Sequence, residues 1–161
     1  LLTRLVPGLL DGLEDEVEGG AVHMLEDDVS RITDRFTGNN KVRGFKPNGY
    51  GPRDLAAPNE DALGGNFYWA ARAEARFPLG LPEEYGIDAG LFADAGSVWG
   101  LDETTGAYGV EVDDTMRVRA AVGVSLFWTT PIGPLRFDVA GPVGGDTGEG
   151  VQVYLGLGQA F

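Results

Sequence analysis

The stretch GGNFYWAARAEARFPL, residues 64–79, alternates between two kinds of side chain. One parity runs from Phe67 to Phe77 and carries aromatic residues and alanines, whereas the other carries charged residues such as Arg72 and Glu74. Successive side chains of a strand point to opposite faces of its sheet, so this alternation predicts a β-strand with one apolar and one charged face.

Similar alternation predicts four further strands, at residues 85–99, 116–128, 135–140 and 151–161. Their connections alternate in length, with short turns at 80–84 and 131–134 and longer polar loops at 101–114 and 144–150. An all-β antiparallel meander with short turns at one end and long loops at the other is typical of a transmembrane β-barrel of the outer membrane. The N-terminal segment, residues 1–18, leaves strand, loop and short helix open.

The two faces of these strands have two interpretations. In a soluble β-sandwich the apolar face forms the core and the charged face meets water. In a membrane barrel the apolar face meets lipid and the charged face lines the lumen. Aromatic residues at the ends of the apolar faces, such as Trp69, Trp99 and Trp128, favour the barrel, as do the length of the strands and the mixture of both charge signs on the other face.

Composition excludes several classes of function. The 161 residues suffice for one domain, and 12 basic against 25 acidic residues give a net charge of −13, which argues against nucleic-acid binding. The chain has no cysteine, and His23 is its only histidine. We therefore expect no disulfide, no metal site, no cofactor and no serine–histidine catalysis, and we predict that the protein is not an enzyme.

Acidic pairs occur in the predicted loops, at Asp27-Asp28, Asp102-Glu103 and Asp113-Asp114. Their spacing matches no calcium-binding loop, so we interpret them as solvated loop residues. No apolar run is long enough for a membrane helix, and the first residues do not form a signal peptide. Because the sequence does not begin with Met, we expect a fragment or a processed piece of a longer protein.

Several motifs occur in a fixed order: KVRGF (41–45), GYGPRD (49–54), ALGGN (62–66), FADAGSVW (92–99), SLFWTTPIGPLRFDVA (125–140) and a last strand that ends in Phe. In this order they resemble the C-terminal barrel portion of the BamA-type outer-membrane assembly proteins, of the bacterial surface antigen superfamily. The resemblance covers residues 19–161. It implies a sixteen-stranded barrel whose last six strands lie in this chain, and a loop, residues 27–62, that folds back into the lumen.

The loop motif Val42, Arg43, Gly44 and Phe45 is the first candidate site. Arginine offers five donors in a rigid fork, glycine allows close approach of the backbone, and phenylalanine supplies an apolar anchor. Two carboxylates, Glu74 and Asp94, lie on the inward parity of adjacent predicted strands, so one guanidinium could bridge them. The resemblance implies the same partners.

The last strand is the second candidate site, with Val153, Leu155, Leu157 and Phe161 on one face. The resemblance implies that a terminal Phe is recognised during assembly and that this strand meets the first strand of the barrel at a seam that opens sideways. Gly156 and Gly158 would weaken its packing, which suits a labile seam.

The function that the resemblance implies is insertion of β-barrel proteins into the bacterial outer membrane by strand templating at that seam. Its partners would be unfolded outer-membrane proteins as clients, accessory lipoproteins, periplasmic POTRA modules of the full-length protein, and lipid or lipopolysaccharide, but no nucleic acid. The alternatives are a two-partner secretion transporter or a TamA-like factor of the same superfamily. A passive outer-membrane pore and a soluble β-sandwich binding module are the other classes.

Overall fold

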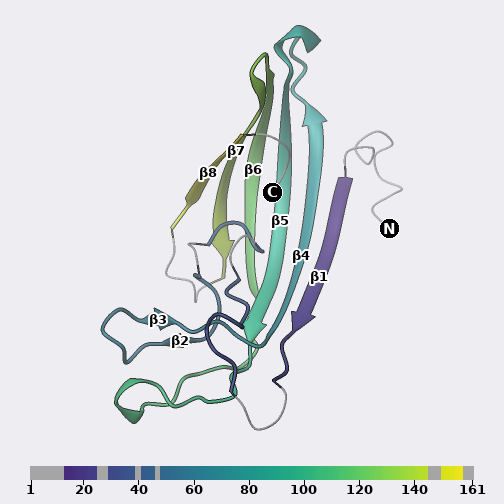
Figure 1. Ribbon diagram of the computed structural model, residues 1–161. Coiled ribbons are helices and arrows are strands. Elements are labelled where there is room, and N and C mark those ends of the chain that lie inside the picture. The colour runs from purple at the N-terminus through teal and green to yellow at the C-terminus, as the bar shows by residue number, and fades with distance from the viewer. Residues whose placement is uncertain (1–12, 25–28, 39–40, 46–47, 145–149, 158–161) are drawn as a thin grey trace.

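The computed structural model describes residues 13–24, 29–38, 41–45, 48–144 and 150–157. One six-stranded antiparallel sheet has the strand order β1-β4-β5-β6-β7-β8 and is curved (Figure 1). We call this curved sheet the wall. Its strands are β1 (Leu13–Ala21), β4 (Phe67–Pro78), β5 (Ile87–Trp99), β6 (Arg119–Thr130), β7 (Gly133–Val143) and β8 (Gln152–Leu157). A small hairpin, β2 (Arg53–Asp54) with β3 (Asp61–Ala62), lies in the connection from β1 to β4.

The predicted alternation in the length of the connections holds only in part. The β6–β7 turn is short and the β1–β4 and β5–β6 connections are long, but the β4–β5 connection, residues 79–86, is as long as the β7–β8 connection, residues 144–151. The β4–β5 and β6–β7 hairpin tips lie at the top of Figure 1, whereas the β5–β6 connection and the β2–β3 hairpin lie at the bottom. Two short 3-10 helices interrupt the connections, η2 (Glu83–Tyr85) before β5 and η3 (Ala107–Gly109) before β6. This antiparallel meander is the predicted fold class, part of a β-barrel.

The predicted bounds need correction at several ends. The strand predicted over 116–128 runs over Arg119–Thr130, and Arg117 lies before it, where it forms an ion pair with Asp113 rather than facing inward. The predicted turn 131–134 is shorter, since Gly133 already pairs with Thr130 at the start of β7. The last strand is described over Gln152–Leu157, and Phe161 and Gly158 lie outside the described residues.

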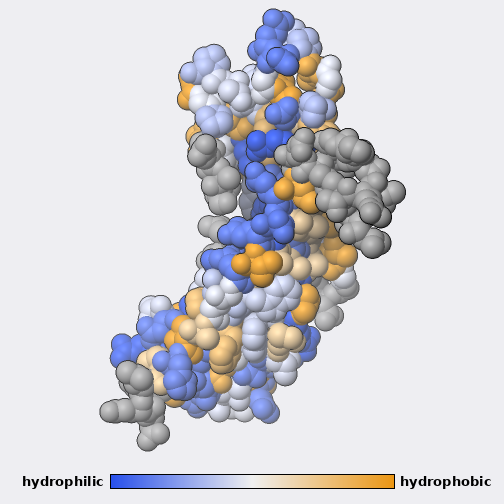
Figure 2. Space-filling model, turned by 90° about the vertical axis from the view of Figure 1, so that its right-hand side faces the viewer, coloured by the Kyte–Doolittle hydropathy of each residue, from blue (hydrophilic) through white to orange (hydrophobic). Residues whose placement is uncertain are grey.

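The N-terminal segment contributes a strand that the sequence left open. Residues 13–18 belong to β1, which pairs with β4 in the register Val17↔Ala71 and Asp15↔Ala73. Four acidic residues crowd this strand: Glu14, Asp15, Glu16 and Glu18. Figure 2, which views the molecule from the β1 side of Figure 1, shows a hydrophilic band down the middle of that side.

The two faces of the sheet differ as the alternation predicted. On the outer face, large apolar side chains stay exposed, among them Leu91, Val122, Val124 and Trp128. On the inner face, Asp94 and Asp138 are each only 2% exposed. On β5, one position departs from the pattern: Ser97 shares the parity of Leu91 but is fully buried, with the large side chain of Trp69 opposite it in the register.

The main cluster of buried apolar residues lies between the sheet and the β1–β4 connection. Val42, Phe45 and Tyr50 of the connection pack with Ala70, Val98 and Ala121 of the sheet. The residues contributed by the sheet are small or medium in size, so the backbone of the connection can approach the inner face closely. In the described part of the chain, no helix is long and apolar enough to cross a membrane.

Candidate loop-docking site

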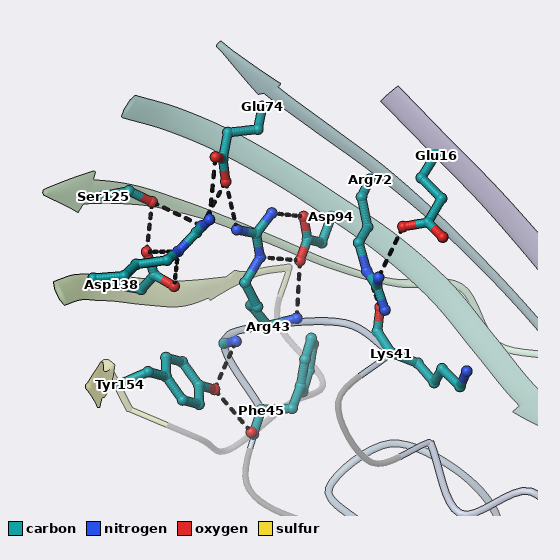
Figure 3. A network of polar contacts seen from close by, with 12 residues as sticks. Glu16, Lys41, Arg43, Phe45, Arg72, Glu74, Asp94, Ser125, Asp138 and Tyr154 are labelled. Carbon is teal, nitrogen blue, oxygen red and sulfur yellow. Dashed lines mark hydrogen bonds and ion pairs between the residues drawn. The ribbon is translucent and has the colours of Figure 1, made fainter. Parts of the chain in front are cut away.

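Arg43 extends from the β1–β4 connection to two carboxylates on the inner face (Figure 3). Its Nε and Nη2 donate to the two oxygens of Asp94 on β5, each at 2.7 Å, and its Nη1 donates to Glu74 on β4, also at 2.7 Å. The backbone N–H of Arg43 donates to Asp94 as well, at 3.0 Å. The Asp94 side chain is fully buried, so this fork of charged hydrogen bonds lies away from bulk water.

A second arginine shares the same carboxylate. The Nη2 of Arg136, on β7, donates to Glu74 at 2.5 Å, and the Nε of Arg136 lies 2.8 Å from a carboxylate oxygen of Asp138. The hydroxyl of Ser125, on β6, donates to Asp138 at 2.5 Å. Glu74 therefore joins the loop arginine to a polar network (Figure 3), whose other members lie on the neighbouring strands β4 to β7.

Gly44 brings the loop backbone against the wall. A Cβ at this position would lie 2.6 Å from the Cβ of Ala121 and 3.4 Å from the Cβ of Ala140. The residue also has φ +92°, a conformation that side chains rarely adopt. Both features require glycine at this position.

Tyr154 of β8 closes the far side of the motif. Its hydroxyl accepts a hydrogen bond from the N–H of Gly44 at 2.9 Å and donates one to the carbonyl of Phe45 at 3.1 Å. The Phe45 ring packs against Tyr50, with 5.4 Å between the ring centroids. The loop is thus held by strands from β4 through β8.

A second set of charges ties the loop to β1. The Nε of Arg72 donates to the carbonyl of Lys41, and its other nitrogens pair with Glu16 and Glu18. Lys41 in turn pairs with Glu18 at 2.9 Å and lies over the ring of Tyr68. The carboxylates of these pairs, Glu16 and Glu18, are more exposed than Glu74 and Asp94, so each of these ion pairs contributes less than those of Arg43.

The electrostatics of the loop favour its charged state. Burial opposes the charge on Arg43, but its hydrogen bonds and attraction to Asp94 and Glu74 outweigh burial and raise the pKa of the guanidinium above its ordinary value. Burial raises the pKa of the Tyr50 phenol, so this residue stays neutral. Arg43 therefore keeps its positive charge at any pH at which the protein is folded.

The structure brings together some of the residues singled out in the sequence and not others. Arg43 meets Glu74 and Asp94, and Val42 and Phe45 are buried beside them. The residues proposed for the seam lie apart from this site: Val153, Leu155 and Leu157 are exposed on the outer face of β8.

Sequence reasoning did not assign Arg136, Asp138, Ser125 or Tyr154 to the site. The alternation alone places Arg136 and Asp138 on the inward face. It does not show that Arg136 reaches Glu74, because that contact depends on the register between strands that lie far apart in the sequence. Tyr154 lies 110 positions from Gly44, and no local pattern links the two residues.

Where the structure describes the acidic pairs, their carboxylates accept hydrogen bonds from other loop residues. Asp102 accepts hydrogen bonds from the Ser30 N–H and the Asn66 side chain, and the bond from Ser30 is the main reason that the pKa of Asp102 is lowered. Asp113 accepts from Thr115. In the described ranges, no group of three or more His, Cys, Asp or Glu residues could hold a metal ion, and Asp27 and Asp28 lie outside those ranges.

Replacing Tyr154 by phenylalanine should loosen the loop without changing its charges. The Gly44 N–H loses its acceptor, at a cost of about 1 kcal/mol, which corresponds to roughly fivefold faster amide exchange if local opening limits exchange. Hydrogen–deuterium exchange of residues 41–45 in the full-length protein measures this. The control is Tyr108→Phe, since Tyr108 is an exposed loop residue. Equal amide exchange in the two variants would show that the Tyr154 hydroxyl does not help to hold the loop.

Comparison with known proteins places this geometry in a family. The model of the Omp85 superfamily domain matches residues 8–161. The outer membrane protein assembly factor BamA of Neorickettsia risticii (strain Illinois) is 40% identical over 123 residues, which cover 76% of this chain and 16% of the relative. BamA of Neisseria meningitidis serogroup B is 30% identical over 139 residues, covering 74% and 17%.

A solved structure agrees with these relatives. The crystal structure of BamA from Haemophilus ducreyi lacking POTRA domains 1–3 matches with a TM-score of 0.54 and 27% identity, over 75% of this chain and 25% of that one. The chain spans about one sixth of the length of the two curated relatives. These matches favour none of the four alternatives: the secretion transporter, the TamA-like factor, the passive pore and the soluble sandwich. The chain therefore belongs to the Omp85 superfamily, a family of outer-membrane β-barrel proteins, and is of the BamA type.

Proposed function

We propose that this chain is the C-terminal wall and docked loop of a protein that assembles β-barrel proteins into the bacterial outer membrane. The 40% identity to a protein named as an outer membrane protein assembly factor carries this proposal. The proposed role is not enzymatic and needs no cofactor. Unfolded outer-membrane proteins are the proposed clients, and POTRA modules, accessory lipoproteins and lipid or lipopolysaccharide are the proposed partners of the full-length protein.

The docked loop would act as a brace inside the barrel. Residues 41–45 contact β4 through β8, so the loop would hold the curvature of this wall while an adjacent seam changes. Buried charge pairs suit such a brace because they specify one position, whereas apolar contacts alone tolerate sliding. In this proposal, Val42, Arg43, Gly44 and Phe45 are the brace, and Glu74 and Asp94 are its main anchors.

The edge of β8 is the proposed template for clients. In the described sheet β8 pairs with β7 on one side only, and it is the last strand in the order. An unpaired strand edge in lipid leaves its N–H and C=O groups unsatisfied, so it favours pairing with an incoming strand. Val153, Leu155 and Leu157 would then face lipid beside the client.

Photo-crosslinking from β8 tests templating. A photoreactive residue at Val153 in the full-length protein should crosslink to a client during assembly in proteoliposomes. The matched control is Val124, which is also an exposed valine of the outer face but lies on β6, between β5 and β7. We expect client adducts from Val153 and a strongly reduced yield from Val124.

Two results would count against templating at this edge. Equal yields at the two positions would indicate general contact with the barrel surface. Client folding at the normal rate with no adduct at Val153 would place the template elsewhere. A disulfide that locks β8 to the first strand of the full barrel gives an independent test, because undiminished client folding in the locked protein would rule out opening at this seam.

A further inference from the structure

The wall side of the docking site is built without the loop. Glu74, Asp94 and Asp138 project from three different strands of one hydrogen-bonded sheet. Arg136 and Ser125, also on the sheet, hold Glu74 and Asp138 in place. Strand pairing therefore fixes the backbone positions of Glu74 and Asp94, and Arg136 also holds the Glu74 carboxylate, so the wall side of the site would keep its place if the loop moved away.

The charge of this cluster changes when Arg43 leaves. With Arg43 in place, two guanidinium groups, Arg43 and Arg136, face the three carboxylates, a sum of −1 for five charged groups. Without Arg43 the same wall carries −2. Within the described residues, the hydrogen bonds that Asp94 accepts all come from Arg43. Its carboxylate would lose each of these partners and could accept the same bonds from another charged donor.

The geometry selects a guanidinium over other cations. Asp94 receives two donors of one planar group, and the Arg43 guanidinium carbon lies 3.7 Å from the centroid of the Phe92 ring. Gly123 makes room for this ring, since a Cβ there would lie 2.3 Å from it. A flat cation can stack on the ring and bond both oxygens at once, whereas an ammonium group is a compact point charge.

A competing arginine of the wall is directed elsewhere. Arg72 lies directly opposite Asp94 in the β4–β5 register. Its guanidinium instead reaches toward β1, where it pairs with Glu16 (Figure 3). It also pairs with Glu18 of the same strand. The pairing with β1 thus keeps the nearest wall arginine away from Asp94.

From these observations we propose that Glu74, Asp94 and Phe92 form a guanidinium-binding socket that takes an arginine side chain of another polypeptide segment in the lumen whenever Arg43 is displaced. This proposal rests on the proposed function in one respect, that the loop can leave its docked position during the working cycle. The loop would then compete with arginines of passing segments for one site, and each arginine that enters would delay its return.

Direct binding of methylguanidinium tests the socket. The full-length Arg43→Ala protein is examined by saturation-transfer NMR of the methyl signal, with wild type and the double variant Arg43→Ala/Asp94→Asn beside it. We expect a signal several-fold stronger in Arg43→Ala than in wild type, which is lost in the double variant. Methylammonium at the same concentration should give a clearly weaker signal.

Each other outcome decides against the proposal. Equal methylguanidinium signals in wild type and Arg43→Ala, or a signal that survives Asp94→Asn, would mean that binding occurs outside the socket. A signal that appears only after Arg72→Gln is added would show that Arg72 fills the site in the natural wall. Heat-modifiable gel mobility first establishes that each variant is folded.

A wild-type measurement serves if Arg43→Ala does not fold. The peptide acetyl-Val-Arg-Gly-Phe-amide should accelerate amide exchange of residues 41–45, and its lysine analogue should not. Equal effects of the two peptides, or none from either, would overturn the proposal. Neither measurement uses client folding, so the assembly role can fail while the socket stands, and the reverse.

Discussion

Replacing Arg43 by glutamate should release residues 41–45 from the inner face of the sheet. The substitution places a third carboxylate beside Glu74 and Asp94, where three charged hydrogen bonds to the side chain are now made. Breaking a buried ion pair from one side costs about 3–5 kcal/mol, and the partial exposure of the Arg43 side chain lowers this figure. Even about 2 kcal/mol would shift the docking equilibrium about thirtyfold.

Two measurements on the full-length protein check this. Amide exchange of residues 41–45 should become much faster, and the rate of client folding in proteoliposomes should fall. Adding Asp94→Arg to the same chain restores one opposite-charge pair with the glutamate, so part of the protection should return. Arg31→Glu is the matched control, because Arg31 is an exposed arginine of the same connection.

The outcomes separate the brace from a simple surface loop. If Arg43→Glu leaves both loop protection and client folding intact, the arginine does not brace the wall. If protection is lost while client folding stays normal, docking is real but is not needed for assembly. Partial recovery with Asp94→Arg, absent with Arg31→Glu, would tie the effect to this pair of residues.

Replacing Gly44 by alanine should have the second largest effect. The added methyl group would lie 2.6 Å from the Cβ of Ala121, a separation that real structures essentially never show. The wall cannot move aside easily, since Ala121 is paired within the sheet to Pro142 and Asp94. We therefore expect the loop to move instead, with faster exchange of residues 41–45 and loss of the Tyr154 hydrogen bonds.

Gly80→Ala is the control that separates the effect of the contact with Ala121 from the effect of backbone strain. Gly80 has φ +72°, also in the left-handed region, but an added Cβ there would meet no atom within 4 Å. Both substitutions carry the strain of a side chain at positive φ, of about 1–2 kcal/mol, and only Gly44→Ala adds the clash. Exchange of residues 41–45 should change in Gly44→Ala and not in Gly80→Ala.

A compensating change completes the test of close approach. Ala121→Gly removes the methyl group that the new side chain would meet, so the double variant Gly44→Ala/Ala121→Gly should recover part of the lost protection. If the double variant is as unprotected as Gly44→Ala, the left-handed backbone is the main requirement at this position and contact with the wall is secondary.

The strands that the sequence predicted best are those with unlike faces. The side chains from Phe67 to Phe77 alternate between apolar and polar because one face of β4 meets apolar surroundings and the other faces a polar interior. β1 could not be assigned in this way, since its acidic residues occupy both faces: Glu16 lies opposite Arg72 on the inner side and Asp15 opposite Ala73 on the outer side. Pairing with β4, rather than a pattern of its own, defines this strand.

The site could be anticipated only in part, for a similar reason. Parity and strand adjacency place Glu74 and Asp94 on one face of neighbouring strands, within reach of one guanidinium. The sequence does not show that Arg136 reaches the same Glu74, because that contact crosses from β7 to β4 over the curvature of the wall. Curvature follows from the packing of the whole sheet, which no single strand encodes.

The hydrogen bonds of Tyr154 have a consequence for the order of folding. They join β8 to a loop that precedes it by 110 positions, so ring closure of this size must occur before either bond can form. The loop therefore cannot complete its docking until β8, the final strand of the described sheet, has paired with β7. A chain that stopped before Tyr154 would keep the hydrogen bonds of Arg43 but lack those of Tyr154. Its loop would therefore be held only in part.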